Sequence, residues 1–277
     1  MRSLLLILLT ICLTASPVTA KSKSKKASKE FSSRAKQALL VEYPSIRVIY
    51  AKNARKGMRP SSMTKLMTTL MVFEAVDAGK VTEDDQVLIS KVAARPRGSR
   101  VSLRQGRKYR FGDLMRAMIV YSANDATVAL AERLAGSEAA FAAAMNKRAR
   151  EIGLLNSSFR NATGFTAKNH KMSAVDIARL AGLILAKYPD RYSIFASRSM
   201  RFGKRKYKNR NPVLGAFKGA DGLKTGHTKA GGYGLVASAK RGERRLILVI
   251  NGLKSAKARK KEAIRMFKWG FRQPASQ

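Results

Sequence analysis

The sequence predicts an α/β (α+β) fold in which strands from both chain ends form one antiparallel sheet and helices occupy the middle. Three observations favour it. Two β-rich segments, 38–41 and 46–50, flank a Tyr-Pro-Ser turn at 43–45. The central part is rich in alanine and leucine at helical spacing, and alternating hydrophobic segments return after Pro189. We therefore expect the two ends to pair, with helices covering the sheet and a mostly helical subdomain beside it.

The expected helices follow from apolar residues that recur every three or four positions. The first opens at Ser62, after a proline that suits a first turn and with Ser61 placed to cap it. Asp113 is placed to start the second, which breaks at 122–124 before helical spacing resumes. The complete set is 62–78, 113–121, 125–134, 141–152, 173–186 and 258–267.

The expected C-terminal strands follow from period-two alternation and glycine punctuation. Residues 199–206 alternate like a strand, and 221–228 form a short strand flanked by glycines. Segments 233–240 and 244–251 form an apparent hairpin across Gly242. The segment 81–109 carries mixed signals and receives no single assignment.

The chain divides into four parts. Residues 1–20 combine a positive start, a short apolar run and small residues just before the expected cleavage site after residue 20, which predicts a secretory signal peptide. Residues 21–36 are polar and basic and predict a disordered arm, 37–272 one folded domain, and 273–277 a tail. Cys12, the chain's one cysteine, lies in the signal peptide, so a mature chain has no disulfide, thiol nucleophile or cysteine–zinc site.

The charge balance indicates an anionic partner. Lys and Arg number 56 against 17 Asp and Glu, giving a formal net charge of +39. An export signal points away from nucleic acid and toward anionic envelope polymers or lipid headgroups. No second apolar stretch approaches membrane-spanning length, so no transmembrane anchor is expected after cleavage. The basic arm is either a solvated linker or an electrostatic adhesion segment.

A serine and a lysine three residues apart mark the expected chemistry. The pattern S-x-x-K occurs at 22/25, 33/36 and 62/65, but only Ser62 and Lys65 stand at the head of an apolar helix. Residues three apart share a helix face, so hydroxyl and amine lie side by side. A lysine held neutral can act as the base that activates such a serine.

Two companion motifs, each unique in the chain, support this interpretation. Ser122-Ala123-Asn124 falls between two predicted helices, where the alternative is an ordinary helix break with an N-cap. Lys224-Thr225-Gly226 lies on a predicted strand, where the glycine lets a ligand backbone approach closely. The three motifs in this order form a known catalytic signature.

The motifs resemble the active site of the D-alanyl-D-alanine carboxypeptidases, the low-molecular-mass penicillin-binding proteins with the β-lactamase/transpeptidase-like fold. The likeness covers about 37–272, which would be the penicillin-binding catalytic domain. Ala123 stands where glycine is common, and Ala162 where proline is common. The chain ends at Gln277, where family members with a second β-rich domain and a C-terminal anchor continue. Further similar stretches are 124–126, 161–165, 173–178, 209–212, 222–228 and 232–239.

The resemblance implies an exported serine-type carboxypeptidase of cell-wall biogenesis, located in the periplasm or envelope. It would remove the terminal D-alanine from peptidoglycan stem pentapeptides through an acyl-enzyme on Ser62, and β-lactams would inhibit it covalently. For Lys65 to act as base, its pKa must fall from about 10.4 to about 7, which costs roughly 4–5 kcal/mol. Burial and the nearby cation Lys224 are the expected causes.

Roles for the other residues also follow from the resemblance. Ser122 would relay a proton to the leaving amine, and Asn124 would hold the substrate amide. The terminal carboxylate would be received by Lys224, Thr225 and Gly226. Arg259 either assists there or is a solvated charge of a basic helix. The backbone N–H groups of Ser62 and His227 would form the oxyanion hole.

No cofactor or metal is expected, because the chain has two histidines and no mature cysteine. His170 lies in a polar loop, which argues against a Ser-His-Asp triad. A class A β-lactamase is disfavoured because Ala123 replaces the required aspartate and the stretch after Glu151 lacks the expected asparagine. A D,D-endopeptidase that cleaves D-alanyl cross-links, or an inactive wall-binding protein, stays open as an alternative.

Overall fold

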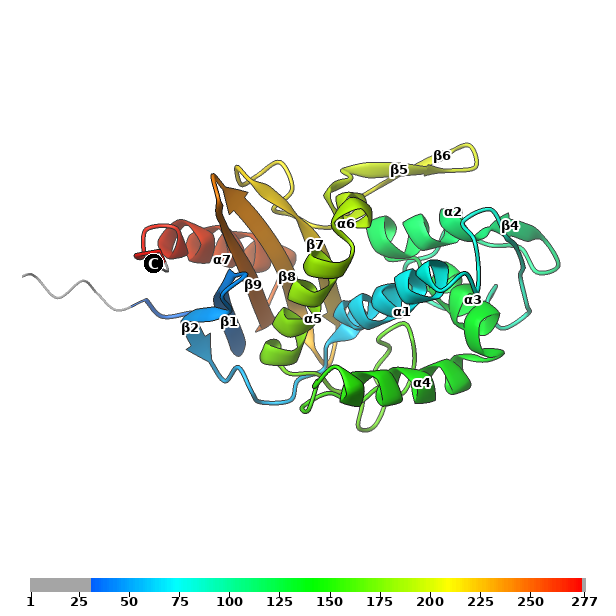
Figure 1. Ribbon diagram of the computed structural model, residues 1–277, viewed down its shortest axis with the longest axis horizontal. Helices are drawn as coiled ribbons and strands as arrows, with labels where there is room; N and C mark the ends of the chain where they lie inside the picture. Colours follow the sequence, from blue (N-terminus) through cyan, green and yellow to red (C-terminus); the bar gives the residue numbers. More distant parts are fainter. Residues whose placement is uncertain (1–30, 276–277) are drawn as a thin grey trace, which may run out of the picture. The chain divides into compact units, whose positions relative to one another are not determined.

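A five-stranded antiparallel sheet joins the two ends of the chain, in the order β2-β1-β9-β8-β7 (Figure 1). The computed structural model describes residues 31–275. N-terminal β1 pairs with C-terminal β9, with Leu40 opposite Leu248. The predicted sheet built from both chain ends is therefore confirmed. Its strands are β1 Gln37–Tyr43, β2 Arg47–Lys52, β7 Ala220–Thr228, β8 Gly232–Arg241 and β9 Arg244–Leu253.

The helices cover the sheet on both faces and form a helical part beyond the β7 edge (Figure 1). Alternate residues of β1 show the two faces. Leu39 and Val41 join the core shared with the central helices, while Leu40 packs against Gly270 of the last helix. The helical elements are η1 Ser61–Thr64, α1 Lys65–Asp77, α2 Phe111–Arg116, the π-helical η2 Ala117–Tyr121, α3 Asn124–Ala135, α4 Glu138–Glu151, α5 Ala174–Lys187, α6 Pro189–Ala196 and α7 Ala256–Gly270.

Two small two-stranded sheets flank the helical part. β3 Gln86–Leu88 pairs with β4 Lys108–Arg110 across a long connection, and β5 Ser199–Phe202 forms a hairpin with β6 Arg205–Lys208. This hairpin replaces the single strand expected at 199–206, because the chain reverses at Gly203, whose φ of 54° favours glycine. α6 was not predicted, since Pro189 reads as a boundary; it opens the helix instead.

The folded unit begins earlier than expected. Ser33 and Ala35 are buried, Ser33 Oγ donates to Glu262 at 2.7 Å, and Lys36 N donates to Asn251 O at 2.9 Å. The expected disordered arm to Lys36 is therefore wrong for Ser33–Lys36, because these contacts tie the segment to α7 and β9. The expected signal peptide and the rest of the arm to residue 30 lie outside the described residues.

The cap expected at Ser61 is wrong. This residue adopts φ 51°, and its hydroxyl lies 3.0 Å from Thr228 Oγ1 of β7 instead of capping the helix. The contact ties the start of η1 to the edge strand of the sheet. Across 31–275, no helix has the length and apolar character needed to cross a membrane.

Candidate active site

Ser62 and Lys65 lie where the sheet meets the helical part, at the start of the helix predicted from the sequence. Ser62 belongs to η1 and Lys65 is the first residue of α1. The Nζ of Lys65 lies 3.2 Å from the Oγ of Ser62, within proton-transfer reach. The spacing of three residues therefore brings hydroxyl and amine together on one helix face.

Burial lowers the pKa of the Lys65 amine into the neutral pH range. Its side chain is 0% exposed, and Nζ contacts Asn124 Oδ1 and Thr163 O, each at 2.7 Å. Burial lowers the pKa of Lys65 from 10.5 to about 7, with repulsion from Arg210 lowering it further and the charges of Glu138 and Asp125 opposing the shift. The pKa that the sequence argument required is the one that this environment produces.

The cation expected to depress the pKa of Lys65 was Lys224, and the two buried lysines do repel each other. Burial, this repulsion and the charges of Arg210 and Arg259 hold the pKa of Lys224 well below its usual value. Arg210 is a second cation that lowers the pKa of Lys65. Lys224 is buried, with 3% of its surface exposed. A carboxylate bound beside Lys224 would favour its protonated form.

Ser122 ends the π-helical turn η2 in a left-handed conformation, with φ 68°. Such a conformation is uncommon for a residue with a side chain and often marks a functional position. The Oγ of Ser122 is buried and has no hydrogen-bond partner within the described chain. It lines the same cavity as Ser62, so this hydroxyl is available to a bound substrate.

Asn124 joins the lysine to the loop before β4. Its Oδ1 accepts from Lys65, and its Nδ2 donates to Arg97 O at 2.7 Å. The neighbouring Asp125 is fully buried and holds the same loop, through the backbone N–H groups of Val101 at 3.2 Å and Leu103 at 3.1 Å. The motif therefore fixes the wall of the cavity as well as contacting Lys65.

β7 forms the opposite wall and is the edge strand of the sheet. Thr225, Gly226 and His227 line the cavity, and alternate backbone N–H groups of an edge strand lack a strand partner. A Cβ at Gly226 would lie 2.6 Å from Pro60 O, so only glycine lets β7 approach η1 so closely. The His227 ring stacks on Tyr233, with centroids 3.9 Å apart.

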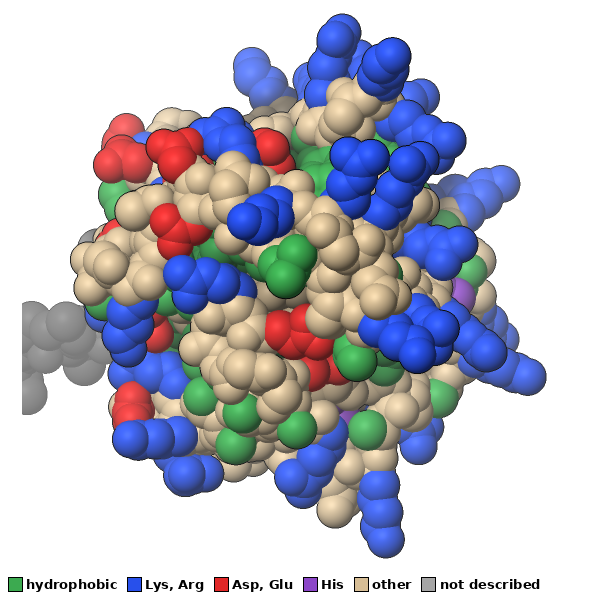
Figure 2. Space-filling model, turned by 90° about the vertical axis from the view of Figure 1, so that its right-hand side faces the viewer, with side chains coloured by type: hydrophobic (Ala, Val, Ile, Leu, Met, Phe, Trp, Pro, Cys, Tyr) green, Lys and Arg blue, Asp and Glu red, His purple; other side chains and the backbone are tan. Residues whose placement is uncertain are grey.

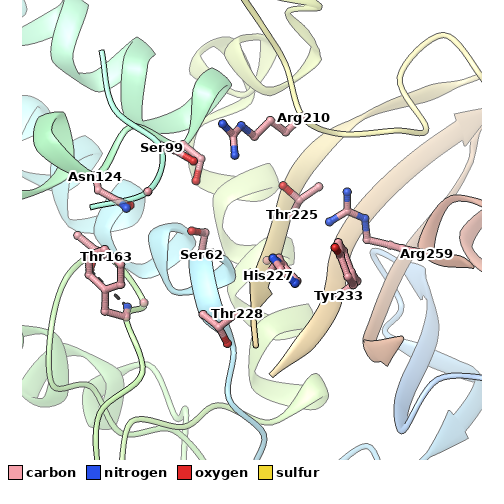
Figure 3. Close-up of a pocket in the computed structure, with 15 residues that line it drawn as sticks. Ser62, Ser99, Asn124, Thr163, Arg210, Thr225, His227, Thr228, Tyr233 and Arg259 are labelled. Atoms are coloured by element: carbon pink, nitrogen blue, oxygen red, sulfur yellow. Dashed lines mark hydrogen bonds between the residues drawn. The ribbon is translucent and has the colours of Figure 1, made fainter. Parts of the chain in front are cut away.

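Two arginines from different elements line the cavity on either side of Thr225, as Figure 3 shows. Arg259 of α7 is 7% exposed, its Nε has no partner among the described residues, and burial lowers its pKa to about 10. This burial contradicts the alternative of a solvated charge. Arg210 follows β6, and its guanidinium carbon lies 4.6 Å from the ring centroid of Tyr121.

These walls enclose a cavity of about 370 Å³, in which Ser62 lies between Asn124, at the start of α3, and the two arginines (Figure 3). The structure thus brings together the predicted residues of all three motifs and Arg259. Lys65 and Lys224 lie behind the surface, while the other predicted residues line it. The lining residues are Ser62, Gly98, Ser99, Ser122, Asn124, Thr163, Gly164, Phe165, Arg210, Thr225, Gly226, His227, Thr228, Tyr233 and Arg259.

Sequence reasoning missed Arg210 and the carbonyl of Thr163. Both lie in stretches already noted for family likeness, 209–212 and 161–165, so local similarity was the available signal. The hydrogen bond from Lys65 to Thr163 O spans 98 positions, and Arg210, which acts on Lys65 through its charge, is further away still along the chain. Neither could be inferred from spacing.

His170 is buried, although its segment reads as a polar loop. Its Nε2 lies 2.9 Å from Thr64 Oγ1, and Nδ1 accepts from Arg160 N at 3.2 Å. Burial lowers the pKa of His170 to about 4, helped by Arg160. The ring is neutral at pH 7 and supports the helix start next to Lys65. Within residues 31–275, no group of three or more His, Cys, Asp or Glu side chains is placed to hold a metal ion.

A family model described as Peptidase S11, D-alanyl-D-alanine carboxypeptidase, matches residues 21–255. The chain belongs to this family. It is 37% identical to the D-alanyl-D-alanine carboxypeptidase DacF of Bacillus subtilis, over 94% of this chain and 68% of the relative. It is also 37% identical to DacC of Escherichia coli, over 84% of this chain and 60% of the relative. The chain thus spans about 60–68% of the length of these two relatives.

Solved structures show the same fold. Penicillin-binding protein 5 of Haemophilus influenzae has a TM-score of 0.85 at 36% identity, covering 88% of this chain and 72% of that one. Penicillin-binding protein D2 of Listeria monocytogenes, in its ampicillin-bound form, has a TM-score of 0.81 at 29% identity, covering 88% and 100%. The predicted family, its transpeptidase-like fold and the class of serine carboxypeptidase are confirmed.

Proposed function

We propose that this protein removes the terminal D-alanine from peptidoglycan stem pentapeptides through an acyl-enzyme on Ser62. One observation carries the proposal: the Ser62 hydroxyl lies 3.2 Å from a buried lysine whose pKa is about 7, facing a wall of cationic side chains. The serine–lysine pair supplies an activated nucleophile at neutral pH. The cationic wall supplies the counter-charge for a substrate that ends in a carboxylate.

Acylation begins with a proton transfer between neighbours. The neutral amine of Lys65 accepts the Ser62 proton as Oγ attacks the carbonyl carbon of the penultimate D-alanine. The negative oxygen is received by the backbone N–H groups of Ser62 and His227, each donor worth about 3 kcal/mol. Ser122, with its unpartnered hydroxyl, gives its proton to the leaving amine and receives in exchange the proton that Lys65 accepted; the C–N bond breaks and free D-alanine departs. Water then hydrolyses the ester.

The carboxylate of the terminal D-alanine binds on the β7 side of the cavity. Arg259 offers an unpartnered Nε, and Thr225 lies between it and Arg210 (Figure 3). Lys224 gains a counter-charge that favours its protonated form, and Gly226 keeps β7 close to η1, so that this wall lies near Ser62. The Asn124 amide offers its remaining hydrogen-bond donor and acceptor positions to the substrate, since one of each is already used by Arg97 O and Lys65.

Labelling with a fluorescent penicillin tests the catalytic assignment. The wild-type protein is expected to take up one label, while Ser62→Ala takes up none and keeps the wild-type melting temperature. Ser61→Ala is the matched control, because its hydroxyl faces Thr228 and not Lys65. Labelling of Ser62→Ala, or none of the wild type, would show the nucleophile to be wrong and favour an inactive wall-binding protein.

Digestion of purified muropeptides separates carboxypeptidase from endopeptidase. Release of free D-alanine from monomeric pentapeptide supports the proposal, whereas conversion of cross-linked dimers to monomers supports a D,D-endopeptidase. The proposal favours the first because a compact group of cations beside Thr225 suits a terminal carboxylate. We also propose covalent inhibition by β-lactams, since penicillin-binding protein D2 of Listeria monocytogenes, which shares this fold, has been solved with ampicillin bound.

We propose export to the periplasm or cell envelope, with an anionic envelope surface as partner rather than nucleic acid. The charge of +39 and the expected signal peptide at 1–20 support this. Cell fractionation tests it: the protein is expected in the envelope fraction and released by high salt. Recovery in the cytoplasm would contradict it.

A further inference from the structure

A marked charge imbalance lies beside the active-site mouth. No acidic residue occurs between Asp85 and Asp113, or between Asp190 and Asp221. Segments 95–110 and 198–210, here called the cationic rim, each carry seven exposed Lys or Arg side chains. Figure 2 shows Lys and Arg gathered over the top and right of this face. The cations are Arg95, Arg97, Arg100, Arg104, Arg107, Lys108 and Arg110 in the first segment, and Arg198, Arg201, Lys204, Arg205, Lys206, Lys208 and Arg210 in the second.

The two segments of the rim form one surface. Phe202 of β5 stacks on Tyr109 of β4, with ring centroids 5.6 Å apart. Tyr207 of β6 packs on Tyr121 of η2 at 4.7 Å, and its hydroxyl reaches Val101 O at 3.5 Å. Aromatic side chains therefore hold the inner face of the β5–β6 hairpin against the loop.

The outer face of the same hairpin is cationic. In the register of β5 with β6, Arg201 is opposite Lys206, and Ser199 is opposite Lys208. Like charges directly opposite each other on neighbouring strands are destabilising. Of the rim's cations, only Arg110 forms an ion pair, with Asp84, among the described residues. The hairpin therefore keeps a repulsive charge arrangement that an anion lying across it would stabilise.

The rim continues into the catalytic cavity. Gly98 and Ser99 of the first segment and Arg210 of the second line that cavity. Lys204, at the hairpin tip, is six residues from Arg210 along largely extended backbone, so the rim reaches roughly 15–20 Å from the site. A terminal dipeptide is too short to cover that distance. A polymer whose end is in the site would lie across the rim.

We propose that the cationic rim binds the carboxylates of the peptidoglycan strand whose stem peptide occupies the site, and so favours polymeric over small substrates. This inference rests on the proposed function. The occupant is the substrate polymer because the charge is continuous with the cavity, whereas a partner unrelated to catalysis would have no need of that continuity. Exposed charge pairs each contribute about twofold in affinity, so three together give about tenfold.

Co-sedimentation with insoluble peptidoglycan tests the rim without turnover, using the Ser62→Ala protein at about 50 mM salt. Adding Lys204→Gln, Arg205→Gln and Lys206→Gln should weaken binding about tenfold. The matched control removes three exposed charges from α7, with Lys257→Gln, Lys260→Gln and Lys261→Gln. α7 covers the face of the sheet opposite to α5, away from the β5–β6 hairpin (Figure 1). It should bind within about twofold of the parent.

Equal weakening in both triple variants, or none in either, would overturn the proposal. The proposal would also be overturned if the hairpin triple variant lost binding to phosphatidylglycerol vesicles but kept its binding to peptidoglycan, since the partner of the rim would then be a lipid surface. In a separate assay on the active protein, the hairpin substitutions should lower kcat/KM on polymer and leave turnover of a blocked acyl-D-Ala-D-Ala peptide unchanged. Failure of the wild type to cleave that peptide counts against the carboxypeptidase assignment alone, because the sedimentation result still decides the rim.

Discussion

The pKa of Lys65 results from burial acting against two nearby carboxylates, so the pH profile of acylation should respond to single charge changes with opposite signs. Glu138 is the largest influence that raises this pKa, and Arg210 is the largest charge that lowers it. Glu138 Oε1 accepts from Ala162 N at 3.0 Å, an acceptor role that a glutamine oxygen can keep. Glu138→Gln therefore removes a charge while preserving the local geometry.

The expected size of the effect follows from the burial of Lys65. A fall from 10.5 to about 7 corresponds to roughly 5 kcal/mol of preference for the neutral amine. Removing one partly screened charge at effective dielectric constants near 20 shifts such a pKa by about 0.5–1 unit, or roughly 0.7–1.4 kcal/mol. At pH 6, a shift from about 7 to about 6.3 raises the neutral fraction of Lys65 roughly three- to fourfold.

Stopped-flow acylation by a chromogenic β-lactam between pH 5 and 9 measures the shift. The wild-type rate should rise through pH about 7 as Lys65 loses its proton. The midpoint should move down in Glu138→Gln and up in Arg210→Gln. Glu243→Gln, a fully exposed position, removes the same charge and should leave the midpoint unchanged. Shifts of the same sign in the first two variants, or no shift, would refute Lys65 as the base.

Three further predictions follow from the buried charges. Arg259→Ala should lower kcat/KM about 10–100-fold for a peptide with a free C-terminal carboxylate; steady-state kinetics with the amidated peptide should show little loss, and an equal loss would exclude carboxylate binding. Asp125→Asn should lower the free energy of unfolding by about 2–4 kcal/mol, measured with denaturant, because it weakens charged acceptors for the N–H groups of Val101 and Leu103; an unchanged stability would contradict this role. His170 has a folded pKa of about 4, below its unfolded value of about 6.5, so its unfolded state binds more protons between these values. Stability should therefore fall by roughly 2 kcal/mol from pH 7 to pH 5, and calorimetry on His170→Gln should show a correspondingly smaller fall.

The periodic elements and the catalytic motifs were predictable because their signals are local. Helical spacing around Leu66 and alternation along β8 and β9 depend on neighbours in the sequence, and the three motifs are read residue by residue. The failures have local causes too. Pro189 is as acceptable at a helix start as at a helix end, and 199–206 alternates without revealing that the strand reverses at Gly203.

The sequence by itself predicted the nucleophile, its lysine neighbour, the companion motifs and the sheet built from both chain ends. It also required that the pKa of Lys65 lie near 7. Only the tertiary structure decided how that value arises, because the burial and repulsion come from residues far apart in the chain. Arg210 adds its repulsion to that of Lys224, Asn124 and Thr163 hold the amine, and the hairpin brings a second cationic segment to the active-site mouth. Electrostatic effects depend on distance in space and on exclusion of water, and neither is encoded in the spacing of residues along the chain.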